Sequence, residues 1–171
     1  MIPKIYRGGS APWRALLAAA RDGYRGGGVL YYTRGTSGSI EILLALRKYN
    51  PNKNTWSIPG GGLELADGKD LVRCAIREAR EEGFGAHATV EAALTAAQSR
   101  ELMAPGSSSV RIRLPFFDWR TLLVELPHKP EGWPRQINEF SRAEWFNVKS
   151  LPPRTHLGVR WVVRHGGRWS P

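Results

Sequence analysis

The chain has little of what would crosslink it or hold it in a membrane. Its 171 residues contain one cysteine, which excludes an internal disulfide and fits a reducing compartment. It has no long apolar run and a mean hydropathy of −0.37, so we expect no membrane-spanning segment and no membrane partner. The four histidines are too dispersed to form a metal site, and no Ser-His-Asp or Cys-His spacing indicates a nucleophile. These absences favour a cytoplasmic protein.

Acidic residues are also in the minority, with 15 Asp and Glu against 25 Lys and Arg, which gives a net charge of +10. The arginines are scattered as on an ordinary solvated surface, but the excess favours anionic ligands such as nucleotides, polyphosphates and RNA. A 42% share of hydrophobic residues is enough for one core, and no internal repeat is found. We therefore expect one domain with short extensions.

Residues 1–26 are predicted to form an N-terminal helical extension. Ser10 is suited to cap a helix and Pro12 to its first turn, and the glycine run at 26–28 ends the pattern. The segment is rich in arginine and has one acidic residue, Asp22, a composition that also fits an organelle-import signal. A helix docked on the domain is the favoured interpretation. Residues 166–171 are predicted to be a C-terminal tail.

Between these ends, hydrophobic patterns predict both strands and helices. Strands are predicted at 29–33, 40–47, 110–114, 119–126 and 144–146, with a hairpin loop at 35–38. Residues 88–97 are also expected to be a strand. An amphipathic pattern at 155–165 predicts a C-terminal helix with Leu157, Trp161 and Val162 in the core.

The most informative element is a predicted helix at 70–82, which presents three distinct faces. Asp70 is placed as its N-cap and Gly83 at its C-terminal end. The apolar arc, suited to packing, contains Val72, Ala75, Ile76 and Ala79. The basic arc contains Arg73, Arg77 and Arg80, and the acidic face contains Glu78, Glu81 and Glu82.

Three carboxylates on one helix face repel one another, so a positive partner should compensate them. Oxygen ligands of this kind suit a hard divalent cation such as Mg2+ or Mn2+. The alternative is a solvated surface helix held by pairs such as Arg77 with Glu81. The glycines at 60–62 favour a site, because they allow close backbone approach and could expose a carbonyl or amide to a metal or phosphate. Cys74, on the acidic face, is expected to be a packing residue.

The segment from Gly61 to Gly85 resembles the Nudix box, G-x5-E-x7-R-E-U-x-E-E-x-G-U, in which U is an aliphatic residue. Residues 77–82 read Arg-Glu-Ala-Arg-Glu-Glu and match its R-E-U-x-E-E core. Pro-Gly-Gly at 59–61 matches the sequence that commonly introduces the box.

Two positions depart from the pattern of the box. Counted strictly, its first glutamate position is Lys69, whereas a two-residue loop insertion makes it Asp67. We favour the insertion, because Asp70 then remains the helix cap. The glycine near the end of the box is replaced by Phe84, which has glycines on either side.

The resemblance covers about residues 27–165 and implies the Nudix fold, an α/β/α sandwich with a mixed β-sheet. It implies divalent-metal-dependent hydrolysis of a diphosphate linkage in a nucleoside diphosphate derivative, by attack of water at phosphorus. Candidate substrates are nucleotide sugars, dinucleoside polyphosphates and nucleoside triphosphates. The implied cofactor is Mg2+ or Mn2+.

The resemblance also assigns roles to individual residues. Arg77 would orient Glu81 or a neighbouring carboxylate, and the general base would be Glu78 or Glu139. We choose Glu139, in the loop before the strand at 144–146, over Glu144 in that strand. The implied metal ligands are Gly60, Glu78, Glu81, Glu82 and Glu139, and the implied catalytic residues are Arg77, Glu78, Glu82 and Glu139.

Substrate contacts outside the box are less defined. Arg47 or Lys48, at a strand end, could meet a phosphate or be surface charge. The aromatic residues Trp133, Trp145 and Phe146 could stack on a base or serve packing. Two rival functions remain, namely action on RNA 5′ ends, which the +10 charge suggests, and nucleotide binding without catalysis, which the irregular loop suggests. The oligomeric state is open, a homodimer included.

Overall fold

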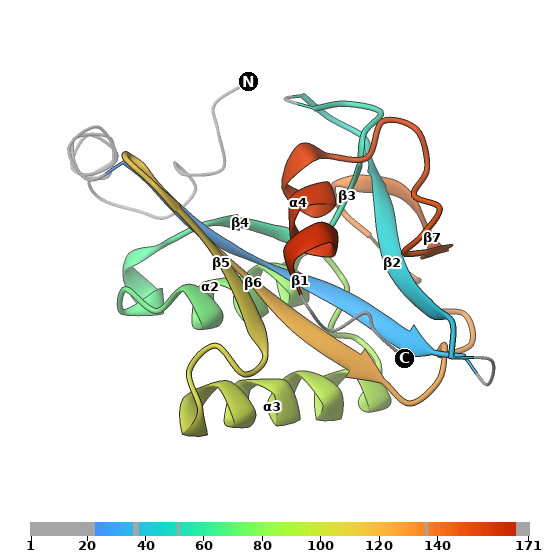
Figure 1. Ribbon diagram of the computed structural model, residues 1–171, viewed down its shortest axis with the longest axis horizontal. Coiled ribbons are helices and arrows are strands. Elements are labelled where there is room, and N and C mark those ends of the chain that lie inside the picture. The colour runs from blue at the N-terminus through green and yellow to red at the C-terminus, as the bar shows by residue number, and fades with distance from the viewer. Residues whose placement is uncertain (1–22, 36–37, 51, 136, 167–171) are drawn as a thin grey trace.

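The computed structural model describes residues 23–35, 38–50, 52–135 and 137–166, and it is built around one seven-stranded sheet (Figure 1). The strands are β1 (Tyr24–Arg34), β2 (Ile40–Arg47), β3 (Trp56–Ser57), β4 (Gly60–Gly62), β5 (Ser109–Leu114), β6 (Phe117–Leu126) and β7 (Phe140–Asn147). Their order is β3-β2-β1-β6-β5, with β4 paired to β1 and β7 paired to β2. The β1–β6 pair is parallel and the other pairs are antiparallel, so the predicted mixed sheet is confirmed.

Helices cover both faces of this sheet. Side chains that alternate along β1 and β6 contribute Val29, Tyr31, Leu122 and Val124 to one core, and Leu30, Tyr32 and Leu123 to the other. The first core is closed by α2 (Leu71–Glu81) and α3 (Ala88–Met103), and the second by α4 (Leu157–His165). Figure 1 shows α4 on the side of the sheet turned toward the viewer. The α/β/α sandwich is therefore confirmed.

The start of the domain differs from the prediction. β1 begins at Tyr24, three residues before the predicted boundary at 27, and it includes the glycines at 26–28. Most of the predicted N-terminal extension, at 1–22, and most of the tail, at 167–171, lie outside the described residues. None of the helices within the described ranges is both long enough and apolar enough to span a membrane.

The prediction of a strand at 88–97 was wrong, because this segment belongs to the 16-residue helix α3. Val90, Leu94 and Ala97 are fully buried, and their spacing of four and three residues is that of a helix face. The side chain of His87 accepts a hydrogen bond from the Thr89 amide and so caps the helix. Alanine favours helices, so the alanines that weakened the strand prediction belong to the helix pattern.

The C-terminal helix is confirmed, but its predicted core was partly wrong. Val162 is buried as expected, together with Val159. Leu157 is 80% exposed and Trp161 is 38% exposed. The helix begins at Leu157, and the face that packs on the sheet is formed by Val159 and Val162, which are three residues apart.

Candidate active site

Helix α2 forms as the sequence predicts and turns its acidic face toward β4. Asp70 caps it, since its carboxylate accepts hydrogen bonds from the amides of Val72 at 2.8 Å and Arg73 at 3.3 Å. The predicted apolar arc is buried in the sheet, and Gly83 ends the helix with a φ of 91°. Because the apolar arc faces the sheet, the neighbouring glutamates are held at the edge where β4 runs.

Two of the three glutamates are buried against the glycines of β4. Glu78 is 3% exposed and Glu82 is fully buried. The amide of Gly60 donates to Oε2 of Glu82 at 2.8 Å. A Cβ atom on Gly61 would lie 2.5 Å from the carboxyl carbon of Glu78, so only glycine leaves room for that carboxylate. The glycine run therefore forms a cradle for the two carboxylates.

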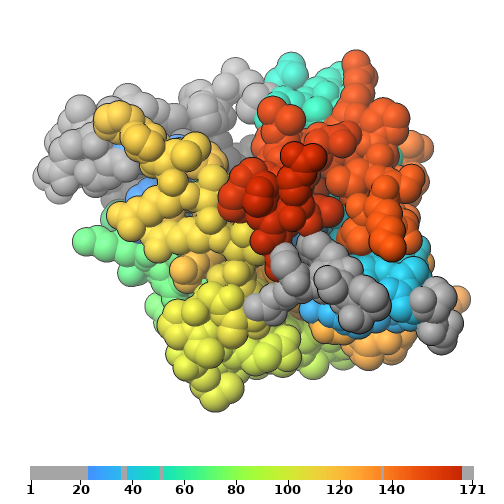
Figure 2. Space-filling view, in the orientation of Figure 1, coloured from blue at the N-terminus to red at the C-terminus, as the bar shows by residue number. Residues whose placement is uncertain are grey.

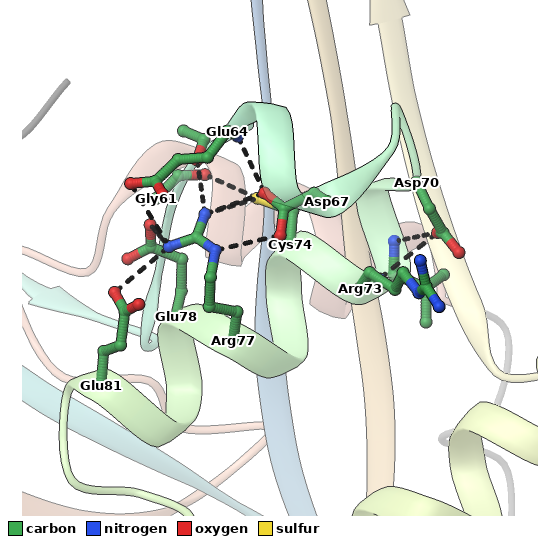
Figure 3. Close-up of polar contacts among 11 residues, drawn as sticks. Gly61, Glu64, Asp67, Asp70, Arg73, Cys74, Arg77, Glu78 and Glu81 are labelled. Atoms are coloured by element: carbon green, nitrogen blue, oxygen red, sulfur yellow. Dashed lines mark hydrogen bonds and ion pairs between the residues drawn. The ribbon is translucent and has the colours of Figure 1, made fainter. Parts of the chain in front are cut away.

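Arg77 is the centre of an ion-pair network beside this cradle (Figure 3). Its guanidinium meets the carboxylate of Asp67 with two hydrogen bonds, of 3.0 and 2.9 Å. Nη1 also donates to Glu78 at 2.9 Å and to Glu81 at 3.2 Å. Asp67, which is 3% exposed, is thus a loop carboxylate that pairs with Arg77, whereas Lys69 is exposed.

The short loop helix η2 (Leu65–Asp67) sets the position of Asp67. The Glu64 amide donates to Oδ2 of Asp67 at 2.8 Å, and Gly68 ends the turn with a φ of 60°. Burial opposes ionisation of Asp67, but hydrogen bonds from Arg77 and this amide outweigh it, so the pKa of Asp67 lies below its usual value. Burial likewise lowers the pKa of Arg77, but Asp67 and Glu78 outweigh it and hold the pKa above its usual value.

The structure places the other two predicted metal ligands on other partners. The side chain of Glu81 is 48% exposed and is paired with Arg77. Glu139 lies directly before β7, as predicted, and its carboxylate is 3.4 Å from Nη2 of Arg47. The segment before β7 nonetheless contacts α2. The side chain of Asn138 donates to the Glu81 carbonyl at 2.7 Å, and the backbone amide of Asn138 donates to the Glu82 carbonyl at 3.4 Å.

Arg47 and Lys48 have different surroundings. The Arg47 guanidinium pairs with Glu139 and lies over the Phe140 ring, and its Nε is buried without a hydrogen-bond partner in the described part of the chain. Lys48 lies over the ring of the exposed Tyr49. Arg47 is therefore the better placed of the two for a phosphate near the glutamates.

The three aromatic residues predicted to stack on a base do not share a surface. Trp133 is 8% exposed and packs edge-on against Tyr31 in the core, so the packing alternative holds for it. Trp145 belongs to the core under α2 and α3, whereas Phe146 packs on Trp56 in the core under α4. Trp145 and Phe146 therefore lie on opposite faces of the sheet.

A different row of rings lies on the face of the sheet opposite α2. Tyr24 stacks on Phe117 with centroids 5.9 Å apart and on Trp119 with centroids 6.3 Å apart. Burial, followed by the nearby Cys74 and Glu78 side chains, raises the pKa of Tyr24 to about 12. This row was not predicted from the sequence, although Phe117 and Trp119 alternate with Asp118 as residues on one strand face do.

The site has the chemistry that a divalent cation needs. Within the described ranges, no three Asp, Glu, His or Cys side chains are close enough together to hold a metal ion by themselves. Mg2+, however, is commonly bound through one or two carboxylates, with water and substrate phosphates as further ligands. Glu78 and Glu82 are such a pair. The four carboxylates paired with Arg77, of Glu64, Asp67, Glu78 and Glu81, exceed its charge by three, and Glu82 on the next turn of α2 adds another negative charge.

Comparison with known proteins agrees with this description. The NUDIX domain family model matches residues 25–165. A Caenorhabditis elegans Ap4A hydrolase is 19% identical with a TM-score of 0.55, over 81% of this chain and 92% of the hydrolase. A bifunctional NMN adenylyltransferase/ADP ribose pyrophosphatase from Francisella tularensis, complexed with AMP and a Mn ion, is 19% identical with a TM-score of 0.60, over 90% of this chain and 45% of that protein.

A third structure, the NUDIX domain of Shewanella oneidensis NrtR complexed with ADP ribose, is 12% identical with a TM-score of 0.51, over 97% of this chain and 93% of that domain. Comparison with curated protein sequences gave no match. At these identities the solved structures establish the fold, and the family model establishes the membership. The chain belongs to the Nudix family, and the prediction of a Nudix-type pyrophosphohydrolase is confirmed at the level of the family.

Proposed function

We propose that the protein hydrolyses a diphosphate linkage in a nucleoside diphosphate derivative, with Mg2+ or Mn2+ as cofactor and water attacking phosphorus. The observation that carries this proposal is the buried pair Glu78 and Glu82 in the glycine cradle of β4. Burying two carboxylates one helical turn apart is unfavourable unless cations offset their charge, and Arg77, at 2.9 Å from Glu78, supplies one positive charge against the two. A hard divalent ion is the cation that carboxylate oxygens suit best.

Glu78 and Glu82 would hold the cation, which supplies an activated water and offsets negative charge on the phosphate oxygens. Arg77 orients Glu78 by the 2.9 Å hydrogen bond from Nη1 and is itself fixed by Asp67. Arg47, paired with Glu139, is placed to exchange that carboxylate for a substrate phosphate. Glu139, once released, is a candidate base beside the C-terminal end of α2.

The row of Tyr24, Phe117 and Trp119 supports a nucleoside as part of the substrate. Its rings lie on the sheet face opposite α2, and Tyr24 lies close enough to Glu78 and Glu82 for both charges to act on its hydroxyl. A base stacked on this row would place its phosphates toward the carboxylates. Base stacking on aromatic side chains is tolerant of base identity, so the row favours nucleotides as a class.

A substrate screen tests the proposal. Nucleotide sugars, dinucleoside polyphosphates and nucleoside triphosphates are incubated with Mg2+ or Mn2+, and release of monophosphate or phosphate is measured. Glu82→Gln should reduce kcat by at least about 100-fold because it removes one of two buried anions. Glu144→Gln is the matched control, since Glu144 is half exposed on β7 and pairs with Arg142.

The screen also tests the rival without catalysis. Nucleotide binding with no product from any substrate, even at high Mn2+, would show that the domain binds and does not hydrolyse. Equal turnover in Glu82→Gln and Glu144→Gln would instead contradict the assignment of Glu82 as a metal ligand, without contradicting hydrolysis by the protein.

A further inference from the structure

A second charged site lies at the edge of the sheet, where β1, β6 and β5 run side by side. In the strand register, Asp118 of β6 is opposite Arg25 of β1 and also opposite Arg113 of β5. Arg111 is two residues from Arg113, so its side chain leaves β5 on the same face. Three arginines on neighbouring strands therefore surround one carboxylate.

The contacts show how this cluster is arranged. Arg111 meets Asp118 with two hydrogen bonds, at 2.8 and 2.6 Å, and Nε of Arg25 is 3.9 Å from the same carboxylate. Within the described residues Arg113 forms no salt bridge. The hydrogen bonds from Arg111 hold the pKa of Asp118 below its usual value, so this carboxylate is ionised at neutral pH.

The neighbouring Arg120 is neutralised separately. It lies directly opposite Arg111 in the register, where two like charges repel each other. Its guanidinium turns to the buried Glu101, at 3.4 Å, which also organises the loop between α3 and β5. The cluster that remains, with three arginines and one aspartate, keeps a net charge of +2.

These side chains line a half-open pocket at the surface, with Phe116 75% exposed at its rim. The pocket has a volume of about 380 Å3 and is lined by the three arginines, Asp118 and residues of the β5–β6 turn such as Phe116. β5 is the terminal strand in the order of the sheet, and Figure 2 shows its yellow atoms at the surface beside the red atoms of α4. A pocket at an edge can receive part of a longer molecule that extends beyond it.

We propose that this pocket binds a phosphate group. The planar guanidinium fork matches phosphate oxygens in geometry and charge, and two or three such forks converge here. Asp118 offsets one of the three arginine charges and leaves two positive charges for the ligand. The phosphate belongs either to a nucleic acid chain or to a free polyphosphate, and both present the same chemistry.

Binding to two probes, without divalent metal, tests the site. The first is a fluorescein-labelled single-stranded oligoribonucleotide, followed by anisotropy over a range of NaCl concentrations. The second is inorganic tripolyphosphate, followed by calorimetry. The test variant is Arg111→Gln with Arg113→Gln, and the matched control is Arg142→Gln with Arg164→Gln, which removes the same charge from two exposed positions.

The test variant should lower affinity at least about 10-fold and flatten the plot of log affinity against log salt by about 1.4, since each single-strand phosphate contact contributes about 0.7. An effect on the oligoribonucleotide alone identifies a nucleic acid chain as the source, and an effect on both probes identifies any polyphosphate. Equal behaviour of test and control variants with both probes overturns the proposal.

Asp118→Asn gives an independent readout. It raises the net charge of the pocket from +2 to +3, so the oligoribonucleotide should bind several-fold more tightly. An aspartate with only a structural role would leave affinity unchanged or weaken it. Arg113→Gln alone serves if the double variant is unstable, because no salt bridge within the described residues is lost with it.

Discussion

Gly61→Ala is the sharpest test of the glycine cradle, because it removes no charged group. A Cβ atom at Gly61 would be 2.5 Å from the carboxyl carbon of Glu78 and 2.6 Å from both carboxylate oxygens. Ordinary contacts begin at 3.4 Å, so the carboxylate must move by about 0.9 Å. A misplacement of about 1 Å at a reacting centre can cost about 100-fold in rate, or about 2.7 kcal/mol.

The adjacent residue supplies the control. A Cβ atom at Gly62 would have the Tyr24 ring as its nearest neighbour, at 3.9 Å, which is an ordinary contact. Gly62→Ala should therefore keep nearly full turnover. The fold should tolerate both changes, since the group displaced by Gly61→Ala is the end of a side chain and the main cost is its hydrogen bond to Arg77, about 2 kcal/mol.

The assay is kcat/KM with the best substrate of the screen over a Mg2+ titration, together with a thermal melt of each variant. Gly61→Ala should lose about 100-fold in kcat/KM and respond less steeply to Mg2+, while it remains folded at the assay temperature. Indistinguishable kinetics for the two variants would refute the reasoning, because Glu78 would then not need the position that the glycine permits.

Three other outcomes follow from the same geometry. Asp67→Asn should cost about 3 kcal/mol of unfolding free energy at pH 7 in urea melts. Since the pKa of Asp67 is depressed on folding, its stabilisation is full above about pH 4 and fades as pH falls through the folded pKa, so the difference between the two proteins should shrink as the pH falls below about 4. Burial raises the pKa of the Cys74 thiol to about 12, so a disulfide reagent at pH 8 should label the native protein much more slowly than the protein in guanidinium chloride, and rapid native labelling would contradict this burial. Trp119→Ala should raise KM by about 5- to 160-fold with little change in kcat, as expected for about 1–3 kcal/mol of base stacking, whereas Trp161→Ala, at a half-exposed position, should not.

Elements with strong local signals could be predicted from the sequence. The helix at 70–82 was predicted with its cap and its buried arc, because Asp70, the apolar spacing and Gly83 are signals within or directly beside the helix itself. The two-residue insertion could also be inferred, since it alone left Asp70 free to cap. Its consequence, the two-pronged contact between Asp67 and Arg77, depends on the path of the loop and became visible only in three dimensions.

Sites that depend on which strand face a residue occupies were not predictable in the same way. Trp133 and Trp119 both stand near turns and are equally aromatic, yet one is a core residue and the other lies in the ring row. Register across β1, β5 and β6 decides this, and register is a property of pairing between distant segments. The arginine cluster around Asp118 was not predicted for the same reason, because Arg25 comes from β1, far along the chain from the hairpin of β5 and β6.

The glycines at 26–28 show why a pattern can be absent where structure is most constrained. A Cβ atom on Gly27 would lie 2.4 Å from the Leu71 carbonyl oxygen, and one on Gly28 would lie 2.9 Å from the Trp119 ring. A strand approached this closely on both faces has no room for side chains, so it has no hydrophobic alternation to detect. The absence of side chains at these glycines also lets α2 pack close to the sheet. A side chain at Gly27 would push the helix outward and move Glu78 away from β4, so the glycine run at 26–28 helps to fix the position of the carboxylates.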